Sequence, residues 1–437
     1  MTNTKRFWVS LVLFSLIGQV AWVVENMYFN VFIYKMFSAS ASDISAMVSA
    51  SSIVATLTTI LIGALSDKFG KRKIFITGGY ILWGFSILGF ALVRTDVIGG
   101  IFPTAVSVSA ICVTITIILD CLMTFFGSSA NDACFNAWLT DVTTDTGRGK
   151  VEGINAMMPL MAILVVFGGF MSFDLSTAKS WTIIFIIIGA VVIALGVAGI
   201  FLIQEPQKTA EENKNYFKNI LYGFKPATIK NNLVLYLVIV AFALFGISIQ
   251  IFMPYLIIYY EVSLALDNYV LIMAPAIIIA GATTAVYGRY YDKVGFIGAI
   301  IPALSCLALG YIILMLFTNV VLVFIGSLFM MTGYLTGMAV FGAMIRDYTP
   351  ENKAGALQGI RIVGQVLIPG IIGPIIGAGV LKNAEVIIGG DGTEQFIPNQ
   401  NIFVAALVAL VVTAVAVVLV RLILKRIAEK NKKIENL

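Results

Sequence analysis

The sequence predicts an all-α integral membrane protein, with twelve transmembrane helices arranged as two pseudo-symmetric six-helix bundles. The first observation behind this prediction is composition, since 59% of the 437 residues are apolar and only 12% are charged. A soluble domain carries about 25% charged residues, and it needs them to cover its surface. The other two observations are a series of long apolar stretches and an internal repeat that relates the two halves of the chain.

Each apolar stretch is long enough for the roughly 20 residues that a helix needs to cross a bilayer. In chain order the stretches are centred near Val20, Ala55, Trp83, Leu119, Ala162, Val191, Phe245, Ile277, Ala308, Leu328, Gly370 and Val412. The fourth is longer than one crossing, because it is apolar from about Ile101 to Leu139. It is either one helix that bends at Gly127-Ser128-Ser129 or two separate segments.

The basic residues decide between these alternatives and fix the orientation. With twelve spans, 24 of the 28 Lys and Arg residues fall in segments on one side of the membrane. Cytoplasmic segments carry such an excess of Lys and Arg. Splitting the fourth stretch would move Arg148 and Lys150 to the opposite side, so we expect a single helix there. Both termini are expected in the cytoplasm, and the chain in the cell (cytoplasmic) membrane.

Several classes of function are not expected from this sequence. It contains no His, which removes the commonest general base and metal ligand. Its four Cys lie inside apolar stretches, so neither a disulfide framework nor a thiolate metal site is expected. No nucleophile elbow and no phosphate-binding loop is present. An enzyme and a metal site are therefore not expected, and the net charge of +5 requires no nucleic-acid partner.

An internal repeat relates segments that lie six spans apart. Gly63–Gly70 follows the second span and Gly288–Gly295 follows the eighth, and both place Gly, Asp, Lys and Gly at the same offsets. A second pair, Asp141–Gly153 and Asp347–Gly359, follows spans four and ten. Two independent matches indicate a duplicated six-helix unit.

Duplicated halves of this kind are the architecture of alternating-access carriers. We expect an N-terminal six-helix bundle over residues 1–203 and a cytoplasmic linker over 204–230. The C-terminal bundle is expected over 231–437, with a basic cytoplasmic tail.

The repeated loops resemble those of a known family. Gly63-x-x-x-Asp67-Lys68-x-Gly70-Lys71-Arg72-Lys73 resembles the cytoplasmic signature loop of the major facilitator superfamily, and Gly288–Gly295 resembles its second-half counterpart. Within that superfamily, Asn-Ala-Trp138-Leu-Thr-Asp141 followed by Arg148-Gly149-Lys150 is similar to the glycoside–pentoside–hexuronide cation symporters. The string Gly18-Gln19-Val-Ala-Trp-Val-Val-Glu25 is similar to the sucrose–proton symporters. The resemblance covers essentially the whole chain and implies the major facilitator fold.

The same resemblance implies that charged residues at the cytoplasmic helix ends hold those ends together in the outward-open state. Their role would be conformational, without contact to substrate. The gate and signature residues expected on this basis are Gly63, Asp67, Gly70, Arg72, Asp141, Arg148 and Glu205 in the first half, and Gly288, Asp292, Gly295 and Asp347 in the second.

Three carboxylates stand out within the spans, where an ionisable residue is costly and marks function by default. Glu25 lies in the outer half of span one, Asp120 in the outer half of span four, and Asp132 nearer the cytoplasmic end of span four. Because burial penalises the charged form, a carboxylate in a span can take up and release a proton near neutral pH. We expect Glu25, then Asp120, then Asp132 to carry protons. The structural alternative for Asp132 is a static ion pair with Arg361 of span eleven.

Polar and aromatic residues share one face of span one and one face of span four, as is typical of helices that line a hydrated cavity. Amides and carboxylates hydrogen-bond to hydroxyl-rich solutes, and an aromatic face covers the apolar side of a sugar ring. The resemblance implies the same, since spans one and four carry sugar contacts in the family. The expected binding residues are Gln19, Trp22, Glu25, Asn26, Asn30, Asp120 and Asn131, together with Arg361 and Gln365 of span eleven. Packing is the alternative role for Trp22.

The sequence therefore predicts a secondary active transporter, a proton-coupled symporter of a small sugar or glycoside that works by alternating access. Sodium-coupled melibiose-type relatives use acidic residues inside span two, whereas here Asp43 sits at its outer end. We therefore expect the proton as the coupling ion in preference to sodium, with no cofactor. The expected partners are a small-molecule substrate and the lipid bilayer, and the expected state is a monomer. The alternative function is proton-driven export of amphiphilic drugs or lipids by the same fold.

Overall fold

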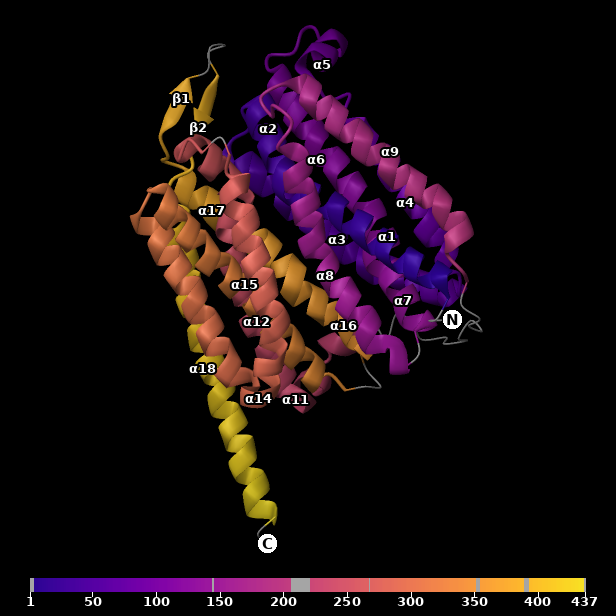
Figure 1. Cartoon of the computed structure of the whole chain (residues 1–437), viewed down its shortest axis with the longest axis vertical. Coiled ribbons are helices and arrows are strands. Elements are labelled where there is room, and N and C mark those ends of the chain that lie inside the picture. Colours follow the sequence, from indigo (N-terminus) through magenta and orange to yellow (C-terminus); the bar gives the residue numbers. More distant parts are fainter. Residues whose placement is uncertain are drawn as a thin grey trace. The chain divides into compact units, whose positions relative to one another are not determined.

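The computed structural model describes residues 4–143, 145–205, 221–266, 268–350, 354–388 and 393–435, most of which are helical (Figure 1). Within these residues, eleven helices are long and apolar enough to cross a membrane. The longest of them, α14 (Val270–Leu316), is interrupted at Gly295, where φ is 70° and ψ is −178°. Since its 47 residues would exceed one bilayer crossing, α14 counts as two spans. The predicted all-α membrane protein with twelve spans is thereby confirmed.

The chain divides into two compact units. Unit 1 comprises Met1–Phe217 with Glu385–Ile397, and unit 2 comprises Lys218–Ala384 with Pro398–Leu437. The bundle expected over residues 231–437 contains the segment 385–397, whereas the structure groups that segment with unit 1. Residues 206–220 of the predicted linker lie outside the described residues.

Unit 1 carries the first six spans. Its elements are α1 (Lys5–Val23), η1 (Val24–Tyr28), α2 (Phe29–Phe37), α3 (Ala41–Phe69), α4 (Arg72–Phe90), α5 (Thr95–Ile101), α6 (Val108–Gly127), η2 (Ser128–Phe135), α7 (Asn136–Val142), α8 (Asp145–Phe170) and α9 (Ala178–Leu202). The fourth apolar stretch forms one continuous span over Val108–Val142, as the basic residues predict. The π-helical segment η2 interrupts this span directly after Gly127, where a bend is expected from the sequence.

Helices in unit 1 approach each other closely where glycines face a neighbour. A Cβ atom at Gly84 of α4 would lie 2.7 Å from the carbonyl oxygen of Gly189 of α9, so only glycine fits at this crossing. The α1 helix packs on α8 and α9, and α3 packs on α6 and η2. This packing places α1, α3 and α6, the elements that carry or face the buried carboxylates, in one bundle (Figure 1).

Unit 2 carries the remaining spans. Besides α14, its elements are η3 (Leu221–Phe224), α11 (Pro226–Asn231), α12 (Leu233–Phe252), η4 (Met253–Tyr255), α13 (Leu256–Ile258), η5 (Tyr259–Ser263), α15 (Val320–Tyr348), α16 (Ala354–Ile362), η7 (Val363–Leu367), α17 (Ile368–Leu381) and α18 (Asn401–Glu435). A Cβ at Gly337 of α15 would lie 2.6 Å from the Phe245 ring, and one at Gly377 of α17 would lie 2.7 Å from the Tyr255 ring. Small residues therefore allow two helices to pack closely against the seventh span.

A two-stranded hairpin connects α17 to α18. Strand β1 (Val386–Ile388) pairs antiparallel with β2 (Glu394–Phe396). The hydroxyl of Tyr34 on α2 donates to the carbonyl oxygen of Phe396 at 2.7 Å, and Gln395 Nε2 donates to the carbonyl oxygen of Tyr34 at 2.9 Å. These contacts anchor the hairpin on α2, within unit 1.

Candidate functional site

Four π-helical segments interrupt spans in the described part of the chain, and each contains a carboxylate or amide side chain within the span. Glu25 lies in η1, Asp132 in η2, Glu261 in η5 and Gln365 in η7. A π-helical turn inserts an extra residue into the helix, and such turns are frequent at functional sites. Glu261 is a span carboxylate that the sequence predictions did not include.

Two of the predicted proton carriers lie close together in unit 1. Glu25 of η1 and Asp120 of α6 are buried, with 7% and 1% of their surface exposed. Their separation is short enough for the two charges to interact. The Thr124 hydroxyl donates to Glu25 Oε1 at 2.8 Å, and the Ser51 hydroxyl of α3 lies beside Asp120. We call Glu25 and Asp120 the carboxylate pair.

Each member of the carboxylate pair has an oxygen that makes no hydrogen bond. Glu25 Oε2 and Asp120 Oδ1 are both buried, and neither has a partner among the described residues. A buried carboxylate oxygen without a donor is costly. The arrangement can lower that cost by holding a proton or by accepting a hydrogen bond from a bound solute.

Asp132, the third predicted proton carrier, lies in the same unit. Ser128 Oγ donates to Asp132 Oδ2 at 3.1 Å, Trp22 lies beside this carboxylate, and Asp132 is near enough to Glu25 for their charges to interact. The alternative partner, Arg361, belongs to unit 2, so the proposed ion pair stays a prediction.

An aromatic pair packs next to these groups. The rings of Trp22 and Trp83 are 5.0 Å apart between centroids and tilted by 47°. A Cβ at Gly127 would lie 2.7 Å from Trp83 and 2.9 Å from Trp22, so this position must be glycine for both rings to fit. Trp83 is fully buried and its indole N–H has no partner among the described residues. Trp83 is absent from the predicted site, because from sequence alone it cannot be told from ordinary span packing.

The predicted amides are mostly engaged within the protein. Asn131 Nδ2 donates to the Tyr80 hydroxyl at 2.6 Å, which in turn donates to the carbonyl oxygen of Phe14 at 2.9 Å. On span one, Asn26 Nδ2 donates to the carbonyl oxygen of Trp22 at 2.8 Å, and Asn30 Nδ2 donates to that of Asn26 at 3.1 Å. Asn131 thus joins η2 to α4, and the span-one amides are bonded along their own helix.

The remaining predicted binding residues are partly accessible. Asn30 Oδ1 is buried without a partner among the described residues, whereas Asn26 is exposed and Gln19 is half-buried. Arg361 and Gln365 lie on the eleventh span in unit 2, and both are half-buried. Their roles in binding stay predictions.

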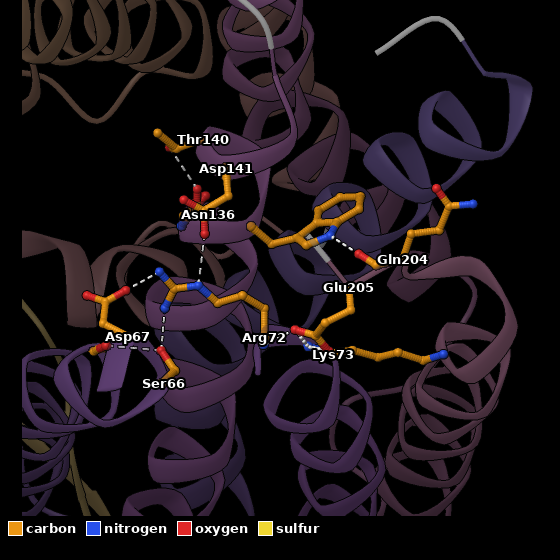
Figure 2. A network of polar contacts seen from close by, with 11 residues as sticks. Ser66, Asp67, Arg72, Lys73, Asn136, Thr140, Asp141, Gln204 and Glu205 are labelled. Atoms are coloured by element: carbon orange, nitrogen blue, oxygen red, sulfur yellow. Dashed lines mark hydrogen bonds and ion pairs between the residues drawn. The ribbon is translucent and has the colours of Figure 1, made fainter. Parts of the chain in front are cut away.

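The signature loop of unit 1 forms a compact polar cluster around Arg72 (Figure 2). Arg72 Nε donates to Asp141 Oδ2 at 3.2 Å, and its terminal nitrogens bond to Ser66 Oγ and to the Asp67 carboxylate. The Arg72 side chain is only 7% exposed and that of Asp141 only 8%. One guanidinium therefore connects the end of α3 to the end of α7.

Glu205 joins the same cluster through the backbone (Figure 2). Its carboxylate accepts from the backbone N–H of Arg72 at 2.5 Å and from that of Lys73 at 3.2 Å. These N–H groups lie in the first turn of α4, where a negative charge is stabilised by the helix dipole. We call Ser66, Asp67, Arg72, Asp141 and Glu205 the latch cluster. The side chain of Arg148, predicted to join it, lies outside the described residues.

The second copy of the signature loop has different contacts. Tyr291 donates from its hydroxyl to Asp347 Oδ2 at 2.6 Å, whereas Asp292 is exposed. Ile297 occupies the position that corresponds to Arg72 at the spacing of the repeat. The second copy therefore has no guanidinium at the place where the first copy is held together.

The glycines of the two copies behave alike. Gly70 and Gly295 both have positive φ, 63° and 70°, a conformation that side chains disfavour. Gly63 and Gly288 are less constrained, since a Cβ at Gly63 would come no closer than 3.9 Å to Ala133, and one at Gly288 would meet nothing within 4 Å. Backbone conformation therefore favours glycine at Gly70 and Gly295, while packing does not require it at Gly63 or Gly288.

Within the described residues, no group of three or more His, Cys, Asp and Glu side chains could hold a metal ion.

Comparison with known proteins relates the chain to membrane transporters. The model of the Major Facilitator Superfamily matches residues 11–374. No curated protein is significantly similar in sequence. A mutant of the nucleoside transporter NupG superposes with a TM-score of 0.71 at 13% identity, covering 94% of this chain and 99% of that chain.

Two further solved structures are similar. A bacterial homologue of the human lysosomal transporter Spinster has a TM-score of 0.68 at 16% identity, covering 96% of this chain and 97% of its own. The xylose transporter XylE from E. coli has a TM-score of 0.68 at 15% identity, covering 94% and 96%. At these identities the similarity establishes the fold, which is the one expected from the signature loops.

Proposed function

The chain belongs to the Major Facilitator Superfamily and is a membrane transporter rather than an enzyme, and on this premise we propose that it is a proton-coupled symporter of a small sugar or glycoside. The proposal includes alternating access, a position in the cytoplasmic membrane with both termini inside, and no cofactor. Among the similar structures, NupG is a nucleoside transporter and XylE a xylose transporter. Both names support a hydroxyl-rich solute for this chain.

The observation that carries the proposal is the carboxylate pair. Glu25 and Asp120 are buried on different spans of unit 1, and each has an oxygen without a donor among the described residues. Two neighbouring carboxylates in a buried site do not both ionise readily, because desolvation and like charge oppose the second ionisation. A single proton shared by the pair removes one charge and supplies one donor.

Solute transport would be coupled to proton transport because the solute and the proton bind to the same oxygens of the carboxylate pair. A sugar hydroxyl can donate to the oxygen of Glu25 or Asp120 that lacks a partner, and the carboxyl proton can donate to a sugar oxygen in return. The Trp22 ring beside Asp132 offers an apolar face to a sugar ring. Solute and proton would then be held together and released together when the site opens to the cytoplasm.

The proposal is tested by internal pH in proteoliposomes that contain the purified protein and a pH-sensitive dye. Monosaccharides, glycosides and nucleosides are added outside in turn, and amphiphilic dyes form a separate set. We expect acidification of the interior for a subset of the sugars or glycosides and for none of the dyes. Protein-free liposomes give the background leak for each compound.

Two other outcomes would contradict the proposal. If nucleosides alone acidify the interior, the transporter is proton-coupled but its solute is a nucleoside and not a sugar or another glycoside. Proton movement or efflux with amphiphilic dyes alone would replace the symporter by the exporter that the sequence leaves as the alternative.

A further inference from the structure

A small cavity lies at the end of unit 1 opposite the latch cluster. It is enclosed by α2, the end of α4, the start of α5 and the first turns of α9. The helix α4 is about 28 Å long at roughly 1.5 Å per residue, close to the thickness of the hydrocarbon core. Because Arg72 at the start of α4 belongs to the latch cluster, the cavity lies near the other surface of the membrane, at the end of unit 1 where Figure 1 shows α5.

Aromatic side chains form the walls of the cavity. Four buried rings line it, those of Phe32, Phe37, Phe90 and Trp181. The Phe32 ring lies 5.2 Å from the rings of both Phe37 and Trp181 between centroids, at interplanar angles of 79° and 58°. Rings at these angles form walls of different orientation. The negative face of an aromatic ring attracts an ammonium group within about 6 Å, so such walls favour a cation over an anion.

A cation and an anion stand at the mouth of the cavity. Arg94 and Asp96 both line it, and their side chains are 39% and 63% exposed. Arg94 donates to the two carboxylate oxygens of Asp96 at 3.0 Å and 2.6 Å. A guanidinium has further N–H donors and a carboxylate has further lone pairs. Both side chains can therefore bind a ligand without giving up their own ion pair.

The size of the cavity limits the ligand. Its volume is about 40 Å³. Since a water-sized group needs roughly 10–15 Å³ of such volume, about three non-hydrogen atoms fit. A primary ammonium on a two-carbon chain meets this limit, whereas a trimethylammonium group on the same chain exceeds it. Thr182, which also lines the cavity, donates its hydroxyl to the carbonyl oxygen of Ala178 at 2.9 Å and keeps lone pairs for an ammonium N–H.

We propose that this cavity binds the primary ammonium group of a small zwitterion, while the anionic group of the same molecule binds Arg94 outside it. The ammonium enters between the rings and donates to Asp96 and Thr182, and the anionic group accepts from the guanidinium. A simple cation would meet Arg94 as a like charge, and a simple anion would meet Asp96. A ligand that carries both charges satisfies both side chains.

Ethanolamine phosphate has this chemistry, either as a soluble molecule or as the headgroup of a phospholipid in the adjacent leaflet. No residue that lines the cavity belongs to the carboxylate pair or to the latch cluster. The inference therefore goes beyond the proposed symport and does not depend on it.

The test measures binding of O-phosphoethanolamine to the purified full-length protein in detergent by isothermal titration calorimetry. Phosphocholine, which differs by three N-methyl groups, tests the size limit. Ethylamine and inorganic phosphate each carry one of the two charges. We expect phosphoethanolamine to bind, and each of the other three compounds to bind at least about tenfold more weakly.

Exposed positions supply variants that do not threaten folding. Asp96→Asn and Arg94→Gln each remove one charge and should weaken binding about tenfold. Ala178→Leu adds a side chain to the lining of the cavity and leaves both charges in place, so it should abolish binding. Asp174→Asn is the matched control, because this exposed carboxylate does not line the cavity and accepts from the backbone N–H of Ser176 at 2.9 Å.

Nanodiscs distinguish the two sources of the ligand. If soluble phosphoethanolamine binds more weakly in discs that contain phosphatidylethanolamine than in discs of phosphatidylcholine, the lipid headgroup occupies the site. Equal binding in both discs assigns the site to the soluble molecule. No binding of phosphoethanolamine in detergent or in phosphatidylcholine discs would overturn the proposal. So would phosphocholine binding of equal strength, or binding that both Asp96→Asn and Ala178→Leu leave unchanged.

Discussion

The two copies of the signature loop keep the same backbone but are held by different side chains. Gly70 and Gly295 both adopt positive φ. In unit 1 the buried Arg72 bonds to three side chains, whereas in unit 2 Ile297 stands at its position and the Tyr291 hydroxyl bonds to Asp347. Duplication therefore preserved the turn, while the ionic network exists only in the first copy among the described residues.

The difference extends to the spans. The carboxylate pair and Asp132 lie in unit 1. Close helix contacts at glycines occur in both units, such as Gly84 against Gly189 in unit 1 and Gly337 against Phe245 in unit 2. The two units therefore differ in the pairing of their span carboxylates and not in how closely their helices pack.

The largest effect is expected from Arg72→Ala. Removing this guanidinium removes the cation that bonds to Asp141 Oδ2, on a carboxylate whose side chain is only 8% exposed. Breaking a buried ion pair on one side costs about 3 kcal/mol or more. We expect a clear fall in the free energy of unfolding, measured by thermal or chemical unfolding in detergent.

In a double-mutant cycle, Arg72→Ala and Asp141→Ala should be strongly non-additive, because they remove the same pair. Additive losses of unfolding free energy would show that Arg72 and Asp141 stabilise the protein independently of each other. The ion pair of the first copy would then give it no stability beyond that of separate surface contacts.

A smaller effect is expected at the shared turn. At Gly295, ψ of −178° places the residue in a region that is nearly restricted to glycine, so Gly295→Ala should cost about 2 kcal/mol. At Gly70, ψ of 17° lies in the left-handed helical region, and Gly70→Ala should cost about 1 kcal/mol. Asparagine tolerates the left-handed region, so Gly70→Asn should be more stable than Gly70→Ala. Gly295→Asn should be no more stable than Gly295→Ala. Equal tolerance of asparagine at both sites would contradict this assignment.

Tyr291→Phe tests the hydrogen bond that unit 2 has in place of the Arg72 contacts of unit 1. It removes the hydroxyl that donates to Asp347 at 2.6 Å and keeps the ring. Because Asp347 is exposed to solvent, we expect a loss of only about 1 kcal/mol in unfolding free energy. A loss as large as that of Arg72→Ala would mean that both copies depend equally on their polar contacts.

The smallest effect is expected for Arg94, which bonds to Asp96 at 3.0 Å and 2.6 Å on the surface of unit 1. These hydrogen bonds hold the pKa of the Asp96 carboxyl below its usual range. Any resulting contribution to the free energy of unfolding is present at pH values above the pKa that the carboxyl has in the unfolded protein. It is lost as the pH falls through the pKa of the carboxyl in the folded protein. Since Asp96 is fully exposed, solvent screens the pair, and Arg94→Ala should leave the unfolding midpoint unchanged at neutral pH.

The spans, the repeat and the charged members of the latch cluster were accessible from sequence because each has a local signal, whereas Ser66 was not predicted. Apolar length predicts a span, and an Asp or Arg at a span end stands out against it. Arg72 and Asp141 could thus be named together, although their distance depends on how α4 and α7 pack.

The partners of the buried carboxylates had no such signal. Thr124, Ser51 and Trp83 are ordinary span residues by composition, and only the packing of α1, α3, α4 and α6 brings them to Glu25, Asp120 and Trp22. The π-helical segments depend on tertiary packing as well, because local propensity does not favour them. The hairpin of β1 and β2 is anchored to Tyr34, more than 300 positions away in the chain, so its docking could not be inferred locally.

The central claim, that proton coupling resides in the carboxylate pair of unit 1, is tested most directly by comparing Glu25→Gln and Asp120→Asn with Glu261→Gln, a span carboxylate of unit 2. For each protein, proton-driven accumulation and solute counterflow are measured in proteoliposomes with the sugar that acidifies wild-type vesicles. We predict that both unit 1 variants lose accumulation, while Glu261→Gln keeps it and all properly folded variants retain counterflow. Accumulation at wild-type rates in both Glu25→Gln and Asp120→Asn would contradict the claim.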